Sequence, residues 1–242
     1  MLYLISLGLY DYKDLSLRAL EALKKCEHVF IDTYTTEINF EIRELEDFIG
    51  KKVTALQRAD LEEKSFRLLD LAERENVAVL VGGDALTATT HITLILDARK
   101  RGIPTRMIHG SSIYTAVCEA GLQIYKFGRT TTLPSFKVAS PYQIIAQNKK
   151  SGLHTLVLLD VGMSAKKGIE TLLEIEREQK RGVLTEEDKL VVCCKLGSEE
   201  QIIVYRTVRE LLKLKTIDCS PCVLIVPGKL HPIEEEMLKS WV

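Results

Sequence analysis

The hydrophobic positions of this chain form short continuous runs, and six of these runs end in glycine or in a glycine–serine cluster. They are residues 1–8, 77–84, 104–112, 154–162, 189–197 and 221–228. Strands that are buried on both faces read as continuous apolar runs. Glycine lets a backbone turn tightly and approach a ligand closely. Because ligands of open α/β sheets bind outside the carboxyl ends of the strands, the pattern predicts small-molecule contacts at several strand ends.

Strand and helix patterns alternate through the first half of the chain. We expect strands over 1–8, 28–32, 52–56, 77–81 and 104–108, and helices over 14–27, 39–50, 59–75 and 85–100. Asp14 and Asn39 are candidate N-caps of the first two helices. Such alternation is typical of a parallel sheet with helices on both faces.

The pattern changes beyond about residue 112. A threonine-rich strand over 130–133 and helices over 141–148 and 166–181 indicate a second unit of mixed strands and helices. We therefore expect two α/β domains, an N-terminal domain with a parallel sheet over residues 1–113 and a C-terminal mixed domain over residues 114–242.

The composition excludes some classes of partner. The 242 residues are 46% hydrophobic and 28% charged, with a mean hydropathy of +0.03 and a formal net charge of −1. This charge gives no overall attraction to nucleic acid or to an anionic membrane. The apolar N-terminal run is too short to span a membrane and lacks the positive leader of a signal peptide. We expect a cytoplasmic protein that binds neither nucleic acid nor membrane.

Two of the six cysteines, Cys219 and Cys222, have the spacing of a redox or metal pair. A thioredoxin-like pair would open a helix, whereas Cys222 opens an apolar strand. A zinc site would need two more ligands, and the sequence offers no second pair at a suitable spacing. We expect reduced, structural cysteines and no metal site.

The glycine loops do not match the common nucleotide motifs. The first strand is followed by Gly8 alone rather than by G-x-G-x-x-G, and no glycine run precedes Lys-Ser or Lys-Thr. In the loop Gly82-Gly83-Asp84, the carboxylate either caps a helix that begins at Ala85 or binds a cationic or hydroxyl-bearing ligand. The threonines of residues 87–90 are poor helix formers, which favours a site here.

Histidines and serines give weaker signals. Ser111 or Ser112 either caps a following helix or contacts a ligand. We expect His91, His109 and His154 to be packed rather than catalytic, because they adjoin apolar runs. His231 differs, because it follows Gly228 and precedes a glutamate-rich helix. We expect it to line the same small-molecule cleft as the strand-end loops.

Together these segments resemble the diphthine synthases, a branch of the tetrapyrrole methylase superfamily of S-adenosylmethionine-dependent methyltransferases. The stretches that carry the resemblance are MLYLISLGL, KDLSLRALE, GGDALTATTH, GIPTRMIHGSSI, AGLQIYKFGRTTTL, GLHTLVLLD and LHPIEEEML. They extend over nearly the whole chain. The combinations GDxxxATTH and GLQxYKFG are specific to this branch, whereas the GGD loop is shared with other tetrapyrrole methylases.

The resemblance implies two α/β domains with a cleft between them for S-adenosyl-L-methionine, and a homodimer. It also implies a substrate, the 3-amino-3-carboxypropyl-histidine of translation elongation factor 2, whose amine is methylated to diphthine in diphthamide biosynthesis. The cofactor-binding residues that it implies are Leu9, Asp84, Thr87, Ser112, Ile113, Met163, Leu196 and His231.

The resemblance names no general base. Transfer of a methyl group from a sulfonium is an in-line displacement that needs an uncharged amine. Positioning and desolvation can therefore catalyse the transfer without a metal or a covalent intermediate. His231 or Asp84 could accept a proton. Two alternatives stay open, a tetrapyrrole C-methyltransferase and a non-enzymatic cofactor-binding adaptor.

Overall fold

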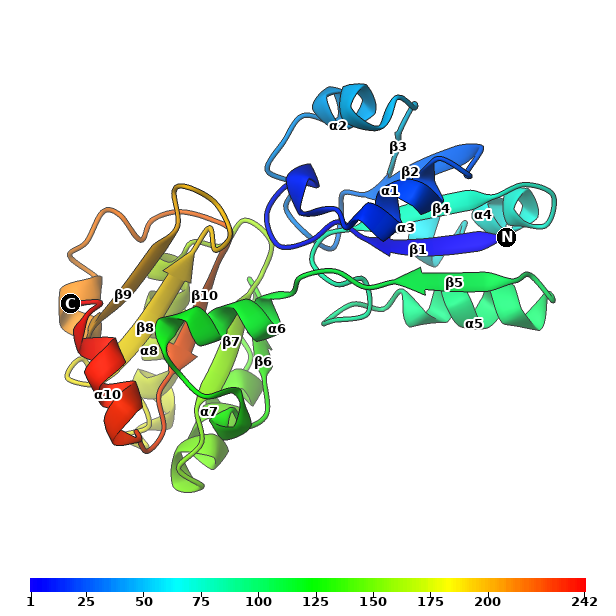
Figure 1. The fold of residues 1–242 in the computed structure, drawn as a ribbon. Coiled ribbons are helices and arrows are strands. Elements are labelled where there is room, and N and C mark those ends of the chain that lie inside the picture. The colour runs from blue at the N-terminus through cyan, green and yellow to red at the C-terminus, as the bar shows by residue number, and fades with distance from the viewer. The chain divides into compact units, whose positions relative to one another are not determined.

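The computed structural model describes all 242 residues, and the chain divides into two compact units, Met1–Ala116 and Val117–Val242. This division lies a few residues beyond the expected boundary after residue 113. Each unit has its own five-stranded sheet (Figure 1).

The N-terminal sheet is entirely parallel, as the alternating pattern predicts. Its strands are β1 (Leu2–Ser6), β2 (His28–Asp32), β3 (Thr54–Leu56), β4 (Val77–Val81) and β5 (Thr105–Ile108). They lie side by side in the order β3-β2-β4-β1-β5 (Figure 1). The central strand β4 and its neighbour β1 are buried along their whole length. Because all five strands run the same way, the loops that follow them meet at one edge of the sheet.

Helices cover both faces of this sheet because successive strand residues point to opposite faces. Tyr3 and Ile5 of β1 pack with α1 (Leu17–Leu23) and α2 (Ile42–Ile49). Leu2 and Leu4 pack on the other face, with α4 (Phe66–Ala72) and α5 (Ile92–Lys100). The continuous apolar runs therefore reflect burial on both sides.

Three of the expected helices differ in detail. The first helix begins at Leu17 rather than near Asp14, because Ser16 Oγ accepts a hydrogen bond from Ala19 N at 3.1 Å. Residues 12–14 form a separate short 3-10 turn, η1. Glu41 rather than Asn39 precedes α2, and it forms a capping box with Glu44. The helix expected over 59–75 is interrupted, giving α3 (Arg58–Glu62) and α4.

The helix expected over 85–100 is wrong for its first half. Only α5, Ile92–Lys100, is helical, and residues 85–91 form turns and bends. Within these turns Ala88 has φ +56°, a left-handed conformation that costs an alanine about 1–2 kcal/mol. The threonines thus lie in an irregular loop, which removes their conflict with helix propensity.

The C-terminal sheet is mixed. Its strands are β6 (Thr131–Leu133), β7 (Thr155–Leu159), β8 (Lys189–Cys194), β9 (Ile202–Thr207) and β10 (Cys222–Val226), in the order β6-β7-β10-β8-β9. The central strand β10 is antiparallel to both of its neighbours. The loops after β7 and β8 therefore lie at one edge of this sheet, and the loop after β10 lies at the other.

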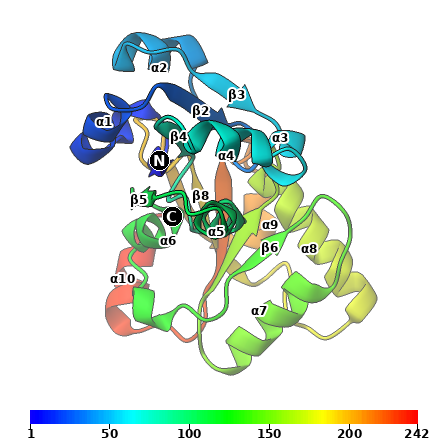
Figure 2. The ribbon, with the colours of Figure 1, turned by 90° about the vertical axis from the view of Figure 1, so that its right-hand side faces the viewer.

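One face of this sheet carries the main core of the unit. The helices α7 (Ser140–Lys150), α8 (Ala165–Gln179) and α9 (Val208–Leu211) contribute to it, and α7 and α8 lie side by side (Figure 2). The remaining helical segments are α6 (Ile113–Ala116), which ends the first unit, η2 (Val117–Ala120), η3 (Ile124–Lys126) and α10 (Pro232–Lys239). None of the helices is both long and apolar enough to cross a membrane.

Candidate functional site

The glycine loops after β1 and β4 bond directly to each other. Gly8 N donates to Gly83 O at 3.2 Å, and Gly83 N donates to Gly8 O at 2.7 Å. Both residues have positive φ, +99° and +66°. At Gly8 a Cβ atom would lie 2.2 Å from that of Asp14, whereas at Gly83 it would meet no atom within 4 Å. The Gly83 backbone is therefore open to the approach of a ligand.

Asp84 joins the loop after β4 to the loop after β5. Its Oδ2 lies 2.8 Å from His109 Nδ1 and accepts from Gly110 N at 3.3 Å, while Oδ1 accepts from Leu86 N at 3.1 Å. Burial raises the pKa of Asp84, but the hydrogen bonds from Leu86, His109 and Gly110 lower it by more. The net pKa is therefore below its ordinary value. The carboxylate is therefore ionised at neutral pH.

This geometry excludes the helix-cap interpretation of Asp84, and ligand binding by its carboxylate stays a prediction. No helix begins at Ala85, so the carboxylate does not act as the expected helix cap. It bonds instead to a turn and to the neighbouring loop. His109, which we expected to be packed, has a side chain that is 69% exposed.

Ser6 at the end of β1 completes the cluster. Its buried Oγ accepts a hydrogen bond from Ala85 N at 3.0 Å. Gly110 approaches so closely that a Cβ there would lie 2.8 Å from that of Ser6. Ser6 is not among the predicted site residues, although a small polar side chain at the end of the apolar run of β1 is a signal that could have found it.

Five of the eight predicted cofactor residues lie at this edge of the N-terminal sheet. Leu9 follows β1, Asp84 and Thr87 follow β4, and Ser112 and Ile113 follow β5. These three strands are adjacent in the sheet. Ser112 is 8% exposed, and its Oγ accepts from Tyr114 N at 3.3 Å at the start of α6, so the expected capping role is also present.

Asp32 at the end of β2 adds a buried pair at the same edge. Its Oδ1 accepts from Tyr34 N at 2.7 Å, and Thr35 Oγ1 donates to its Oδ2. His91 Nε2 lies 3.1 Å from that Oδ2, although neither ring nitrogen of His91 has a well-aligned hydrogen-bond partner. Burial raises the pKa of Asp32, but these donors lower it below its ordinary value. His91 is packed, as expected. Asp32 is not among the site residues predicted from the sequence.

In the C-terminal unit, Met163 and Leu196 lie at one edge of the sheet, after β7 and β8. The start of β10 is at this edge too, where Cys222 Sγ donates to Met163 O at 3.4 Å. Cys222 opens its strand as predicted, opposite Cys194 of β8. A structural role for Cys222 is predicted from the sequence, but its position beside Met163 is not.

The thiols here have the character of packed cysteines. All six cysteines are free. Burial and contact with Cys194 raise the pKa of Cys219 to about 12, so this thiol is protonated rather than a reactive thiolate. No cluster of three or more His, Cys, Asp or Glu side chains is arranged to hold a metal ion.

His231 lies at the other edge of the C-terminal sheet from Met163 and Leu196, and its predicted contact with the cofactor stays a prediction. His231 follows β10, which ends beside Thr155 at the start of β7. Because β10 is antiparallel to β7 and β8, its carboxyl end lies at the opposite edge. Five strand residues separate the two edges by roughly 17 Å. The direction of a strand in a mixed sheet is set by long-range pairing, which local sequence does not reveal.

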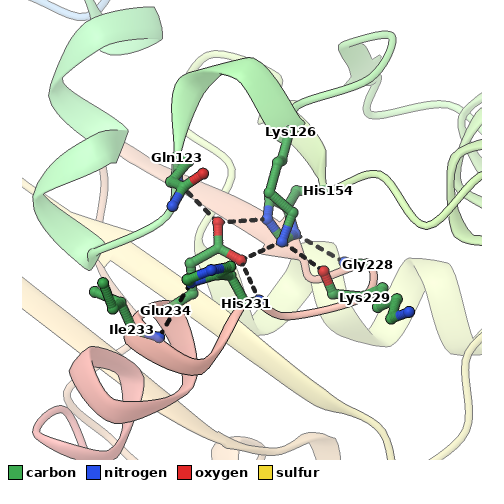
Figure 3. Close-up of polar contacts among 8 residues, drawn as sticks. All are labelled: Gln123, Lys126, His154, Gly228, Lys229, His231, Ile233 and Glu234. Atoms are coloured by element: carbon green, nitrogen blue, oxygen red, sulfur yellow. Dashed lines mark hydrogen bonds and ion pairs between the residues drawn. The ribbon is translucent and has the colours of Figure 1, made fainter.

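His231 belongs to a different cluster, centred on the buried carboxylate of Glu234 at the start of α10 (Figure 3). Glu234 Oε1 accepts from Gln123 N at 3.0 Å, and Oε2 accepts from His231 N at 2.8 Å and pairs with Lys126 Nζ. His154 Nδ1 accepts from Gly228 N at 2.9 Å, so its Nε2 carries the proton and faces Glu234 Oε1 at 3.2 Å.

The charges of this cluster fix its protonation. Burial raises the pKa of Glu234, but the donors from His231, Lys126, Gln123 and His154 outweigh it and lower the pKa from 4.5 to about 2. Burial also lowers the pKa of His154, which stays neutral. The cluster ties the loop of residues 123–128 to α10 (Figure 3). His154 is packed, as expected.

The fold and these strand-end loops agree with one family. The model of the Tetrapyrrole (Corrin/Porphyrin) Methylases matches residues 1–212. The chain belongs to the tetrapyrrole methylase family.

Its relatives narrow the assignment. The chain is 38% identical to a diphthine synthase of Methanocaldococcus jannaschii, over 99% of this chain and 98% of the relative. It is 36% identical to a diphthine methyl ester synthase of Schizosaccharomyces pombe, over 100% of this chain and 94% of the relative. A crystal structure of a diphthine synthase covers 100% of this chain and 95% of its own, with a TM-score of 0.93 and 35% identity. Within its family, the chain is of the diphthine synthase branch.

Proposed function

We propose that the protein is an S-adenosyl-L-methionine-dependent methyltransferase that methylates the amino group of the 3-amino-3-carboxypropyl-histidine of translation elongation factor 2. The observation that carries this proposal is full-length similarity to diphthine synthases in both sequence and fold. The same observation favours this activity over a tetrapyrrole C-methyltransferase, because the relatives named here belong to the diphthine branch.

The strand-end edge of the N-terminal sheet suits the cofactor. The open backbone at Gly83 allows close approach, and ionised Asp84 offers a negative charge to a cationic group. Ser112 can still donate its hydroxyl proton. When bound, S-adenosyl-L-methionine supplies an electrophilic methyl group. We assign Leu9, Asp84, Thr87, Ser112 and Ile113 to its binding, and the roles of Met163, Leu196 and His231 stay predictions.

The residues of this edge act by holding and orienting. Asp84 is unsuited to proton abstraction, because its pKa is low and its two oxygens already accept three hydrogen bonds from the protein. His231 is also unsuited, because it lies away from Met163 and Leu196 and its Nδ1 caps α10 by accepting from Ile233 N at 3.4 Å. Neither residue is therefore the general base.

The test is incubation of the protein and S-adenosyl-L-methionine with two forms of elongation factor 2, one carrying the 3-amino-3-carboxypropyl group and one unmodified. We expect the intact mass of the modified factor alone to rise in steps of one methylene. No increase in either factor would refute the function. Cofactor binding without turnover on either factor would favour the adaptor alternative.

The number of methyl groups added distinguishes a diphthine synthase from a diphthine methyl ester synthase, the two names found among the relatives. An amine can accept methyl groups only until it is quaternary, so any further methyl must esterify the carboxylate. Mild alkaline hydrolysis removes an ester methyl and leaves an N-methyl in place. We also expect a homodimer, as the resemblance implies, and light scattering during gel filtration measures it.

A further inference from the structure

One histidine combines a buried carboxylate partner with an exposed ring. His109 follows β5, and its Nδ1 lies 2.8 Å from Asp84 Oδ2. The side chain of Asp84 is 10% exposed, whereas that of His109 is 69% exposed. The pair lies at the edge of the sheet to which we assign the cofactor.

The partner fixes where the proton of the ring lies. Ionised Asp84 only accepts hydrogen bonds, so His109 Nδ1 must be the donor. A neutral imidazole that carries its proton on Nδ1 has its lone pair on Nε2. No protein group bonds to Nε2 of His109. The exposed ring thus offers a proton acceptor at Nε2, and the carboxylate behind it orients the ring.

The other four histidines of the chain have different arrangements. His28 pairs with Glu75 on the surface, at the opposite end of β2 from the strand-end edge. His91 is buried against Asp32, and His154 is buried against Glu234. His231 caps α10 through Nδ1. Only His109 has an exposed ring and a carboxylate partner at the strand-end edge of the N-terminal unit.

We propose that His109 is the residue that removes the proton from the substrate ammonium before each methyl transfer. This assignment rests on the proposed function, which needs a neutral amine. Nε2 uses its lone pair to bind the proton, and the substrate nitrogen keeps the electron pair of the broken N–H bond. That pair forms the new N–C bond, while the electrons of the C–S bond return to sulfur, which leaves as a thioether. The imidazolium then loses its proton to solvent.

Two variants separate proton transfer from architecture. His109→Ala removes the acceptor, and His109→Asn keeps a donor close to the position of Nδ1 but has no acceptor at the position of Nε2. We expect both to lower kcat by about 100-fold or more. S-adenosyl-L-methionine affinity, measured by calorimetry, should stay within about 3-fold in His109→Asn. Added imidazole should partly restore the rate of His109→Ala.

His28→Ala is the matched control, because it removes the imidazole of a surface histidine–carboxylate pair. Its kcat should equal that of the wild type, with or without imidazole. Wild-type kcat in both His109 variants, with a methylating wild-type protein, would refute the assignment alone. A wild-type protein that methylates no factor would refute the proposed function as well.

A spectroscopic measurement tests the proton arrangement without cofactor or turnover. Nitrogen-15 NMR of the protein labelled at histidine distinguishes the two neutral tautomers, and His109→Ala assigns the signal. We expect the proton of neutral His109 on Nδ1. The opposite tautomer would overturn the proposal, because Nε2 would then be unable to accept a proton.

Discussion

The buried carboxylate of Glu234 gives the sharpest prediction for stability. Its four donors come from the segment before β6, from His154 just before β7, and from the residue that precedes α10. Glu234→Gln keeps the shape of the side chain and removes the charge. Lys126, His154 and two backbone amides then face a neutral amide, which also places an N–H group among donors.

The magnitude follows from the pKa. A lowering from 4.5 to about 2 corresponds to about 3 kcal/mol of stability at neutral pH. This agrees with the roughly 3–5 kcal/mol lost when one partner of a buried ion pair is removed. Because the folded-state pKa is the lower one, the contribution is complete above about pH 4.5. It is lost progressively as the pH falls towards about 2.

The assay is urea unfolding monitored by the fluorescence of Trp241, the only tryptophan of the chain. Its indole donates to Ala120 O at 3.2 Å, so it reports on the C-terminal unit. We expect Glu234→Gln to lose about 3 kcal/mol at pH 7 and the difference from wild type to shrink below pH 4. Glu236→Gln, an exposed change on the same helix, should alter stability by less than about 0.5 kcal/mol.

Equal stabilities for Glu234→Gln and wild type at pH 7 would refute the reasoning. So would a difference that stays constant down to pH 2, because the charge would then contribute nothing.

Three further changes test the strand-end edge. Asp84→Asn should weaken S-adenosyl-L-methionine binding by about 10-fold in calorimetry, because it removes the charge; unchanged affinity would exclude Asp84 from the cofactor site. Gly8→Ala should lower the free energy of unfolding by about 2 kcal/mol or more, because φ is +99° and the new Cβ meets Asp14; urea unfolding measures it, and a neutral result would contradict the geometry. Ala88→Gly should leave stability unchanged or raise it by up to about 1 kcal/mol in the same assay, because it relieves the left-handed strain. A large loss would contradict that strain.

The N-terminal fold could be predicted because its information is local. The apolar runs of β1 and β4 are continuous, since both faces of these strands are covered. Regular alternation with helices then implies a parallel sheet. The strand-end position of Asp84 and Ser112 follows directly from this arrangement.

The predictions from the sequence fail where contacts between distant residues determine the local structure. The segment after Asp84 forms turns and no helix, because the carboxylate bonds to Leu86 N and to the loop of His109 and Gly110. The edge on which His231 lies depends on the antiparallel pairing of β10 with β7 and β8. Neither property is encoded in hydrophobic periodicity.

The central claim concerns the atom that is methylated, and fragmentation mass spectrometry of the modified peptide of elongation factor 2 tests it most directly. After incubation with the protein and S-adenosyl-L-methionine, we expect the added mass on the amino group of the 3-amino-3-carboxypropyl-histidine. Added mass on another residue, or none on this side chain, would contradict the account.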